Sequence, residues 1–330
     1  MKLGVLQFFS WPERRVDLAT VYARALERIE IMDQTGYDAV WLAEHHFSSF
    51  SVCPSVHMVG TLAAARTKRL RIGTAVSLAP FYHPLRLAEE VALLDLLSGG
   101  RVNWGAGRGF ARVEFTAFGV PPEESASRFR ETVEIVLKAW TDEKLSFTGQ
   151  HFHFDDVEVL PKPTQRPHPP VWMAVTSESA IDWAASRGFS ILMDPHSTGP
   201  EIGAKRRRYA DKLAVAGFSE AGRDIPIARL VAIADNTGKA AAVARSGAEW
   251  ILNSYLGAQH RPVIHQGFTP AGVDPIQRYL DEVILHGTPD KVGDEILRLR
   301  EEIALDYLLC APLSHESFML LTEKVLPRLS

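Results

Sequence analysis

The chain has 330 residues with 36 basic and 40 acidic side chains, which leaves a net charge of −4. This balance offers no basic excess for nucleic acid or for an anionic membrane surface, and no apolar run approaches the ~20 residues that span a bilayer. The length fits one large domain, and 46% hydrophobic residues are ordinary for a globular protein with a sizeable core.

The two cysteines, Cys53 and Cys310, are isolated and do not form a disulfide framework. Unpaired thiols fit a reducing compartment, and the amino terminus lacks the pattern of a signal peptide. We therefore expect a cytoplasmic protein.

Strand-like and helix-like segments alternate along the chain. The first strand is predicted at residues 3–8, and Asp17 is a suitable N-cap for a helix with apolar residues at helical spacing as far as Met32. Further strands are predicted at residues 39–42, 70–76, 102–105, 171–175, 190–193, 227–234 and 306–311, and helices at about 58–65, 87–97, 127–140, from 177, 202–216, 239–256, 290–302 and 316–326.

This alternation, repeated about eight times, predicts an α/β fold with a parallel sheet, and closure at eight strands is the TIM (β/α)8 barrel. An open doubly wound sheet is the alternative. Polar or glycine-rich clusters follow several strands and favour the barrel. We expect one domain over residues 1–330 with insertions: a hairpin at about 145–160, and a loop at about 257–274 that loses all periodicity.

Glu44-His45-His46 follows the predicted strand at residues 39–42. Histidine titrates near neutrality and can move a proton, and parallel β/α folds place their chemistry at this end of a strand. Alternation points His45 and His46 to opposite sides, so at most one faces a barrel mouth. A structural role is the alternative. We expect no metal, because the other same-face histidine pair lies on the predicted hairpin.

Gly105-Ala106-Gly107-Arg108-Gly109 follows another strand. It is not a dinucleotide fingerprint, which would need glycine in place of Phe110 and a helix starting there. A backbone with few side chains can approach a flat ligand, and Arg108 can bind a phosphate bidentately. A tight turn with a surface arginine is the alternative.

Thr176 and Ser177 join the predicted strand at residues 171–175 to a helix. Hydroxyls and backbone N–H groups at a helix start can hold a phosphate, although a simple N-cap is the commoner outcome. Arg128, early in the preceding helix, is a candidate second cation or an ordinary surface residue.

These segments in this order resemble the bacterial luciferase-like flavin-dependent monooxygenase family. The likeness runs from Met1 to about Met193 and more weakly to the end. It is carried by Trp41–Phe47, Gly73-Thr74-Ala75 with His83-Pro84, Gly100-Arg101 with Gly105–Gly109, and Trp183–Gly188.

The resemblance implies a TIM barrel that binds reduced FMN at the carboxyl ends of its strands. His45 matches the catalytic histidine of the family. Residues that match its phosphate contacts, or lie beside them, are Arg108, Arg128, Ser177 and Thr176, and Ala75 and Val76 match a pair joined by a non-prolyl cis peptide bond behind the flavin ring.

Two positions depart from the family pattern. Gly107 stands where light-emitting members carry a cysteine, which argues against a light-emitting enzyme, and Ala180 replaces a phosphate-binding threonine. Residues 257–274 match a mobile lid.

The reaction implied by the resemblance uses reduced FMN from a separate flavin reductase, together with O2. A flavin 4a-hydroperoxide would oxygenate a hydrophobic organic substrate such as a carbonyl compound, with His45 supplying or removing the proton. The family also implies at least a homodimer. Alternatives are a deazaflavin-dependent oxidoreductase on the same barrel, a flavin-binding protein without catalysis, and a barrel isomerase or hydrolase.

Overall fold

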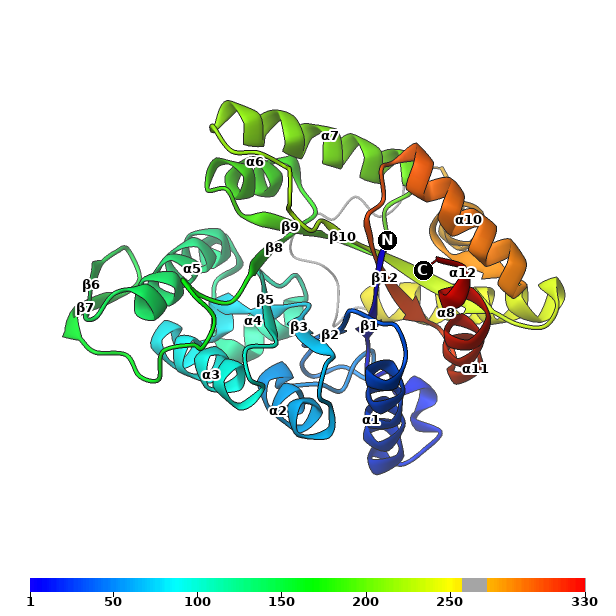
Figure 1. Ribbon diagram of the computed structural model, residues 1–330, viewed down its shortest axis with the longest axis horizontal. Coiled ribbons are helices and arrows are strands. Elements are labelled where there is room, and N and C mark those ends of the chain that lie inside the picture. Colours follow the sequence, from blue (N-terminus) through cyan, green and yellow to red (C-terminus); the bar gives the residue numbers. More distant parts are fainter. Residues whose placement is uncertain (257–271, 330) are drawn as a thin grey trace.

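Eight parallel strands form a closed ring in the computed structural model, which describes residues 1–256 and 272–329 (Figure 1). The ring closes where Ile227 pairs with Met193, so the predicted TIM barrel is confirmed. Around the ring the strands are β1 (Lys2–Gln7), β2 (Ala39–Leu42), β3 (Arg71–Thr74), β5 (Val102–Gly107), β8 (Val171–Val175), β9 (Ser190–Met193), β10 (Pro226–Ile233) and β12 (Tyr307–Pro312).

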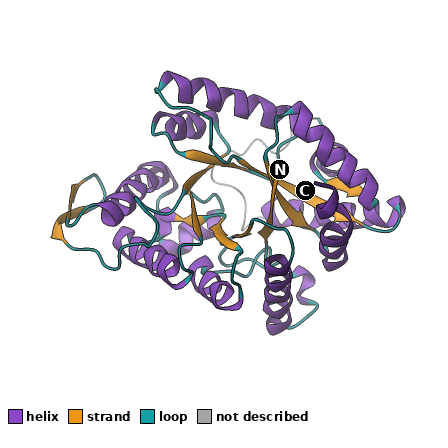
Figure 2. Ribbon diagram, viewed as in Figure 1, coloured by secondary structure: helices purple, strands orange, loops and turns teal. Residues whose placement is uncertain are grey.

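Helices surround the strands on the outside (Figure 2). Their ends follow the sequence signals: the Asp17 side chain accepts a hydrogen bond from the backbone N–H of Thr20 at 2.9 Å and begins the first helix. None of the helices in the described part of the chain is both long and apolar enough to cross a membrane. They are α1 (Leu18–Gln34), α2 (Val56–Arg66), α3 (Pro84–Leu97), α4 (Arg112–Phe118), α5 (Ser125–Thr141), α6 (Glu178–Ser186), α7 (Gly199–Val215), α8 (Thr237–Leu256), α9 (Pro275–Arg278), α10 (Pro289–Glu302), α11 (His315–Leu320) and α12 (Leu326–Leu329).

An antiparallel pair, β6 (Leu145–Thr148) and β7 (His153–Val157), lies in the region of the predicted hairpin, at the far end of α5 from the barrel (Figure 1). Several short elements have no counterpart in the prediction, because so few residues display no period. Among them are α4, α9, β4 (Ser77–Leu78) and β11 (Leu285–Gly287). Of the predicted loop at 257–274, residues 257–271 lie outside the described residues.

Aromatic side chains fill the barrel interior below the carboxyl rim. Trp41 packs edge-on against Trp172, with ring centroids 5.2 Å apart, and its indole N–H donates to the Tyr307 hydroxyl at 3.1 Å. Glycine at position 73 makes room for this indole, because a Cβ there would lie 2.3 Å from a Trp41 ring carbon. Space for a ligand is therefore left at the carboxyl rim.

Arg101, part of the Gly100-Arg101 motif, anchors the strand β5 to the end of α2. Its guanidinium donates to the backbone carbonyls of Ala64, Thr67 and Leu70 at 2.9, 3.1 and 2.8 Å. It also donates to the Thr67 hydroxyl at 2.8 Å and to the Ser98 carbonyl at 2.7 Å. The fork of N–H groups thus satisfies carbonyls at a helix C-terminus that otherwise lack partners.

We expect Arg101→Lys to lower the free energy of unfolding by about 2 kcal/mol or more, because an ammonium group cannot replace this set of bonds. The matched control is Arg66→Lys, which disturbs one exposed ion pair with Glu30 at 2.9 Å and should cost less than about 1 kcal/mol. Urea unfolding of both variants measures the difference, and equal losses would contradict the anchoring role.

Candidate functional site

A cavity of about 210 Å³ opens at the carboxyl ends of the barrel strands. All of the site residues predicted from the sequence line it except Arg128. The seven that line it are His45, Ala75, Val76, Gly107, Arg108, Thr176 and Ser177, which come from the ends of β2, β3, β5 and β8.

His45 lies at one end of this cavity, among aromatic rings. Its ring stacks on Phe8 with centroids 6.3 Å apart, and Phe50 and Phe110 meet it edge-on at 5.2 and 6.0 Å. The side chain is 13% exposed. The surroundings exclude most water, so a proton held on this imidazole is kept from bulk solvent.

A buried carboxylate, Glu114 of α4, faces the same imidazole. Its Oε1 lies 3.6 Å from Nδ1 of His45 and accepts a hydrogen bond from the backbone N–H of His46 at 3.1 Å. The residue is 1% exposed, and its Oε2 has no hydrogen-bond partner among the described residues. At this distance the carboxylate faces the imidazole without a hydrogen bond between them.

His46 turns to the other side, as the alternation of an extended segment predicts. Its Nε2 lies 3.0 Å from Oε1 of Glu44, and its ring packs edge-on against Phe118 at 4.8 Å. It does not line the cavity. Of the two adjacent histidines, only His45 therefore reaches a ligand in this cavity.

Two guanidinium groups also line the cavity. Arg108 and Arg130 both line it, and the pKa of Arg108 is lowered by burial and by the like charge of Arg130. Arg130 also lies over the Trp183 ring, 5.7 Å from its centroid. Like charges close together repel each other, and a bound anion would offset that repulsion.

Arg128, the predicted second cation, points elsewhere. Its Nε donates to Oε2 of Glu124 at 2.8 Å, one turn earlier on the polypeptide. Residues two apart on a helix lie on different faces, so when Arg130 faces the cavity Arg128 cannot. Of these two arginines, Arg130 and not Arg128 lines the cavity.

Ser177 is the N-cap of α6, and its hydroxyl accepts a hydrogen bond from the backbone N–H of Ala180 at 3.3 Å. Ser179 lies 3.2 Å from the same hydroxyl, and both serines line the cavity. The helix start thus presents hydroxyls and backbone N–H groups near the two arginines, which suits a phosphate.

Small residues at the ends of β3 and β5 line another part of the cavity. The peptide bond between Ala75 and Val76 is cis, as the resemblance implies. Position 107 must be glycine for this packing, because a Cβ there would lie 2.2 Å from Cγ2 of Val76. A planar ring system can approach such a wall closely.

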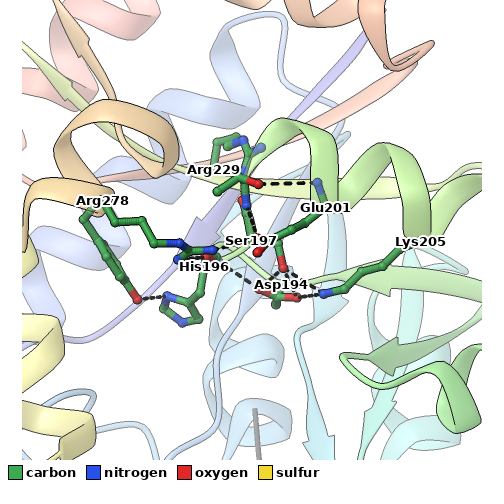
Figure 3. A network of polar contacts seen from close by, with 9 residues as sticks. Asp194, His196, Ser197, Glu201, Lys205, Arg229 and Arg278 are labelled. Carbon is green, nitrogen blue, oxygen red and sulfur yellow. Dashed lines mark hydrogen bonds and ion pairs between the residues drawn. The ribbon is translucent and has the colours of Figure 1, made fainter. Parts of the chain in front are cut away.

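A network of buried charges forms the opposite wall, after β9 (Figure 3). Asp194 accepts hydrogen bonds from Lys205 at 2.8 Å, from the Ser197 hydroxyl at 3.1 Å and from the backbone N–H of His196 at 2.9 Å. Burial acts to raise the pKa of Asp194, but these neighbours, Lys205 foremost, lower it below its ordinary value. The network fixes the loop that carries His196.

His196 lines the cavity opposite His45 and is 6% exposed. Its Nδ1 lies 3.0 Å from the Tyr279 hydroxyl of the π-helical turn η4 (Tyr279–Val283). Burial lowers its pKa to about 4, and the positive charges of Lys205 and Arg278 act in the same direction. The imidazole is therefore neutral at physiological pH.

The sequence analysis did not identify Glu114, Arg130 or His196, because it looked mainly at residues directly after predicted strands. Glu114 and Arg130 lie on helices, and the sequence analysis assigned no role to the segment that follows the predicted strand at residues 190–193 and carries His196. Searching the described residues for groups of three or more metal-ligating side chains finds none.

Stability should fall on acidification between about pH 6.5 and pH 4 through His196. In this range the unfolded chain binds a proton on the imidazole and the folded chain does not, so the free energy of unfolding rises with pH. We expect His196→Gln to flatten this slope by up to about 1.4 kcal/mol per pH unit. Urea unfolding at several pH values tests this, and parallel slopes would contradict it.

The model of the luciferase-like monooxygenase family matches residues 1–306. Among curated proteins, the uncharacterized protein y4wF of Sinorhizobium fredii is 33% identical over 298 residues, covering 89% of this chain and 85% of its own length.

Among solved structures, the monooxygenase RslO1 from Streptomyces bottropensis has a TM-score of 0.88 and 28% identity, with each chain covered in full. The oxygenating constituent of 3,6-diketocamphane monooxygenase from Pseudomonas putida, solved with FMN, has a TM-score of 0.80 at 20% identity, covering 99% of this chain and 98% of its own. An F420-dependent secondary alcohol dehydrogenase has a TM-score of 0.79 at 17% identity, covering 100% of this chain and 99% of its own. At identities of 20% and 17%, the last two structures show the fold alone. Because the family model covers nearly the whole chain, this protein belongs to the luciferase-like monooxygenase family.

Proposed function

We propose that this protein is a flavin-dependent monooxygenase. It would use reduced FMN, delivered by a separate flavin reductase, and O2 to oxygenate a small hydrophobic organic molecule. One observation carries the proposal: a single cavity is lined by a sheltered imidazole, that of His45, and by the guanidinium groups of Arg108 and Arg130. The likeness to the monooxygenase RslO1 over its whole length supports an oxygenase.

The lining of the cavity fits FMN. Arg108 and Arg130, with the start of α6, provide cationic and neutral donors for a phosphate. The wall of Ala75, Val76 and Gly107 admits a planar ring, since a Cβ at position 107 would collide with Val76. The combination of these features in one cavity suits a molecule that carries a phosphate and a flat ring.

Reduced FMN, when bound, would supply the electrons that activate O2. His45 would hold or move the proton that the reaction needs, and Glu114 would keep its Nδ1 oriented from 3.6 Å. Phe8, Phe50 and Phe110 would exclude water from that end of the cavity.

Anaerobic titration with reduced FMN and with reduced F420, followed by oxygen consumption with a panel of carbonyl and thioether compounds, tests the proposal. We expect tight binding of reduced FMN and substrate-dependent oxygen uptake with an oxygenated product. Binding of F420 alone would favour the deazaflavin-dependent oxidoreductase. Binding of FMN without any turnover would favour a flavin-binding protein that lacks catalysis.

The two arginines that line the cavity should matter for FMN, and Arg128 should not. We expect Arg108→Gln or Arg130→Gln to raise the dissociation constant of reduced FMN about 10- to 100-fold, because each removes a charge-assisted hydrogen bond to the phosphate. Arg128→Gln is the matched control from the same helix as Arg130. Its dissociation constant for reduced FMN should stay within about threefold of the value for the unsubstituted protein. A larger effect of Arg128→Gln than of Arg130→Gln would refute this assignment.

Substitutions at and beside His45 should lower the rate of oxygenation without changing the affinity for FMN. We expect His45→Ala to slow oxygenation at least about 100-fold, and Glu114→Gln about 10-fold or more, with FMN affinity nearly unchanged. His46→Ala serves as the neighbouring control, because His46 does not line the cavity. Product formation in single turnover measures the rates. Unchanged turnover in His45→Ala would remove this residue from the mechanism.

A further inference from the structure

A second, larger cavity of about 840 Å³ adjoins the first. It lies between α1 and α8, at the carboxyl ends of β1 and β12. Leu6, Phe8 and His196 line both cavities, so the two share a wall. The volume is within the usual range for a site that holds a small organic molecule.

The shared wall lies next to the catalytic end of the first cavity. Phe8 stacks on His45 at 6.3 Å and meets Phe50 edge-on at 5.1 Å, and Phe50 lines the second cavity. A molecule in the second cavity can therefore contact the aromatic group that surrounds His45 without occupying the positions assigned to the cofactor.

Most of the second cavity is apolar. Beyond the residues it shares with the first, the two long helices and the strand ends contribute aliphatic and aromatic side chains. They are Val16, Val21, Ala25, Leu230, Val243, Trp250, Ile251, Ala311 and Leu313. Burial of an alkyl or aryl group against these side chains would supply affinity through the hydrophobic effect.

Two cations on one face of α1 give the cavity its charge. Arg24 and Arg28, one turn apart, both line it, and neither forms an ion pair with any described residue. Arg28 lies over the Phe318 ring, and its Nε has no hydrogen-bond partner in the part of the chain that the structure describes. Burial and the neighbouring Arg24 lower the pKa of Arg28 to about 10, so it stays charged at neutral pH.

Few acids oppose these cations. Glu13 is paired with Arg15 at 2.6 Å, which leaves Glu249 on α8 as the other acid of the lining. A partly buried guanidinium without an anionic partner is unfavourable, and a carboxylate would provide the missing charge.

We propose that the second cavity binds the organic substrate and that this substrate is an acid with an apolar body. Its carboxylate would lie at Arg24 and Arg28, and its apolar part would extend towards Phe8 and His196. This inference rests on the proposed function for the reaction itself, but the binding of the acid does not depend on FMN.

Calorimetric titration of the full chain with decanoate and with decan-1-ol tests the proposal, since the two probes share an alkyl chain and differ in charge. We expect decanoate to bind at least tenfold more tightly at low salt. The double variant Arg24→Gln/Arg28→Gln should weaken decanoate at least tenfold and change decan-1-ol less than twofold. Arg66→Gln is the control, an arginine that lines neither cavity.

A second variant tests whether the two probes bind in this cavity, without removing a charge. Ala242 lies on an exposed part of α8 and lines the cavity, so Ala242→Trp should obstruct it and weaken both probes at least tenfold. Arg245→Trp, exposed on the same helix and outside the lining, should change neither. Equal affinities for the two probes, or the same loss in Arg66→Gln as in the double variant, would overturn the proposal. Failure to bind reduced FMN would instead overturn the proposed function alone.

Discussion

Closure of the eight-stranded ring is the constraint on which the site depends. When β9 pairs with β10 through Met193 and Ile227, the carboxyl ends of all eight strands meet at one rim. His45, Arg108 and Ser177 are far apart in the sequence and line one cavity for this reason. An open sheet would not place the strand ends that carry His45 and Ser177 around a common space.

The filling of the barrel decides how deep that space is. Trp41, Trp172 and Tyr307 occupy the interior, and the small residues around them, Gly73 among them, allow this packing. The ligand must therefore lie at the rim, where charged groups from loops and helices can reach it. The result is a cavity lined both by two cations and by an imidazole that faces a buried carboxylate.

Much of this arrangement follows from the sequence, because apolar runs mark strands and each strand end marks a position on the rim. The eight-stranded barrel, the role of alternation at His45 and His46, and seven of the residues that line the cavity could be predicted in this way. The remaining residues could not. Arg130 and Glu114 lie on helices, where a charged residue usually faces solvent, and only the tertiary structure shows that Arg130 lines the cavity and that Glu114 is buried beside His45.

Other expectations stay predictions. The structure contains one chain, so the homodimer and the separate reductase are not tested, although exposed apolar side chains occur on α2 and α3, at Met58, Leu62, Leu93 and Leu97. The second cavity was not foreseen because it is formed by helices from opposite ends of the chain, α1 and α8. No local sequence pattern indicates that α1 and α8 together line a cavity.

A crystal structure with bound FMN tests the central claim most directly. We expect the phosphate within hydrogen-bond distance of Arg108 and Arg130, the ring against Ala75 and Val76, and His45 beside the ring. A phosphate bound away from both arginines, or a ring turned away from His45, would contradict the account.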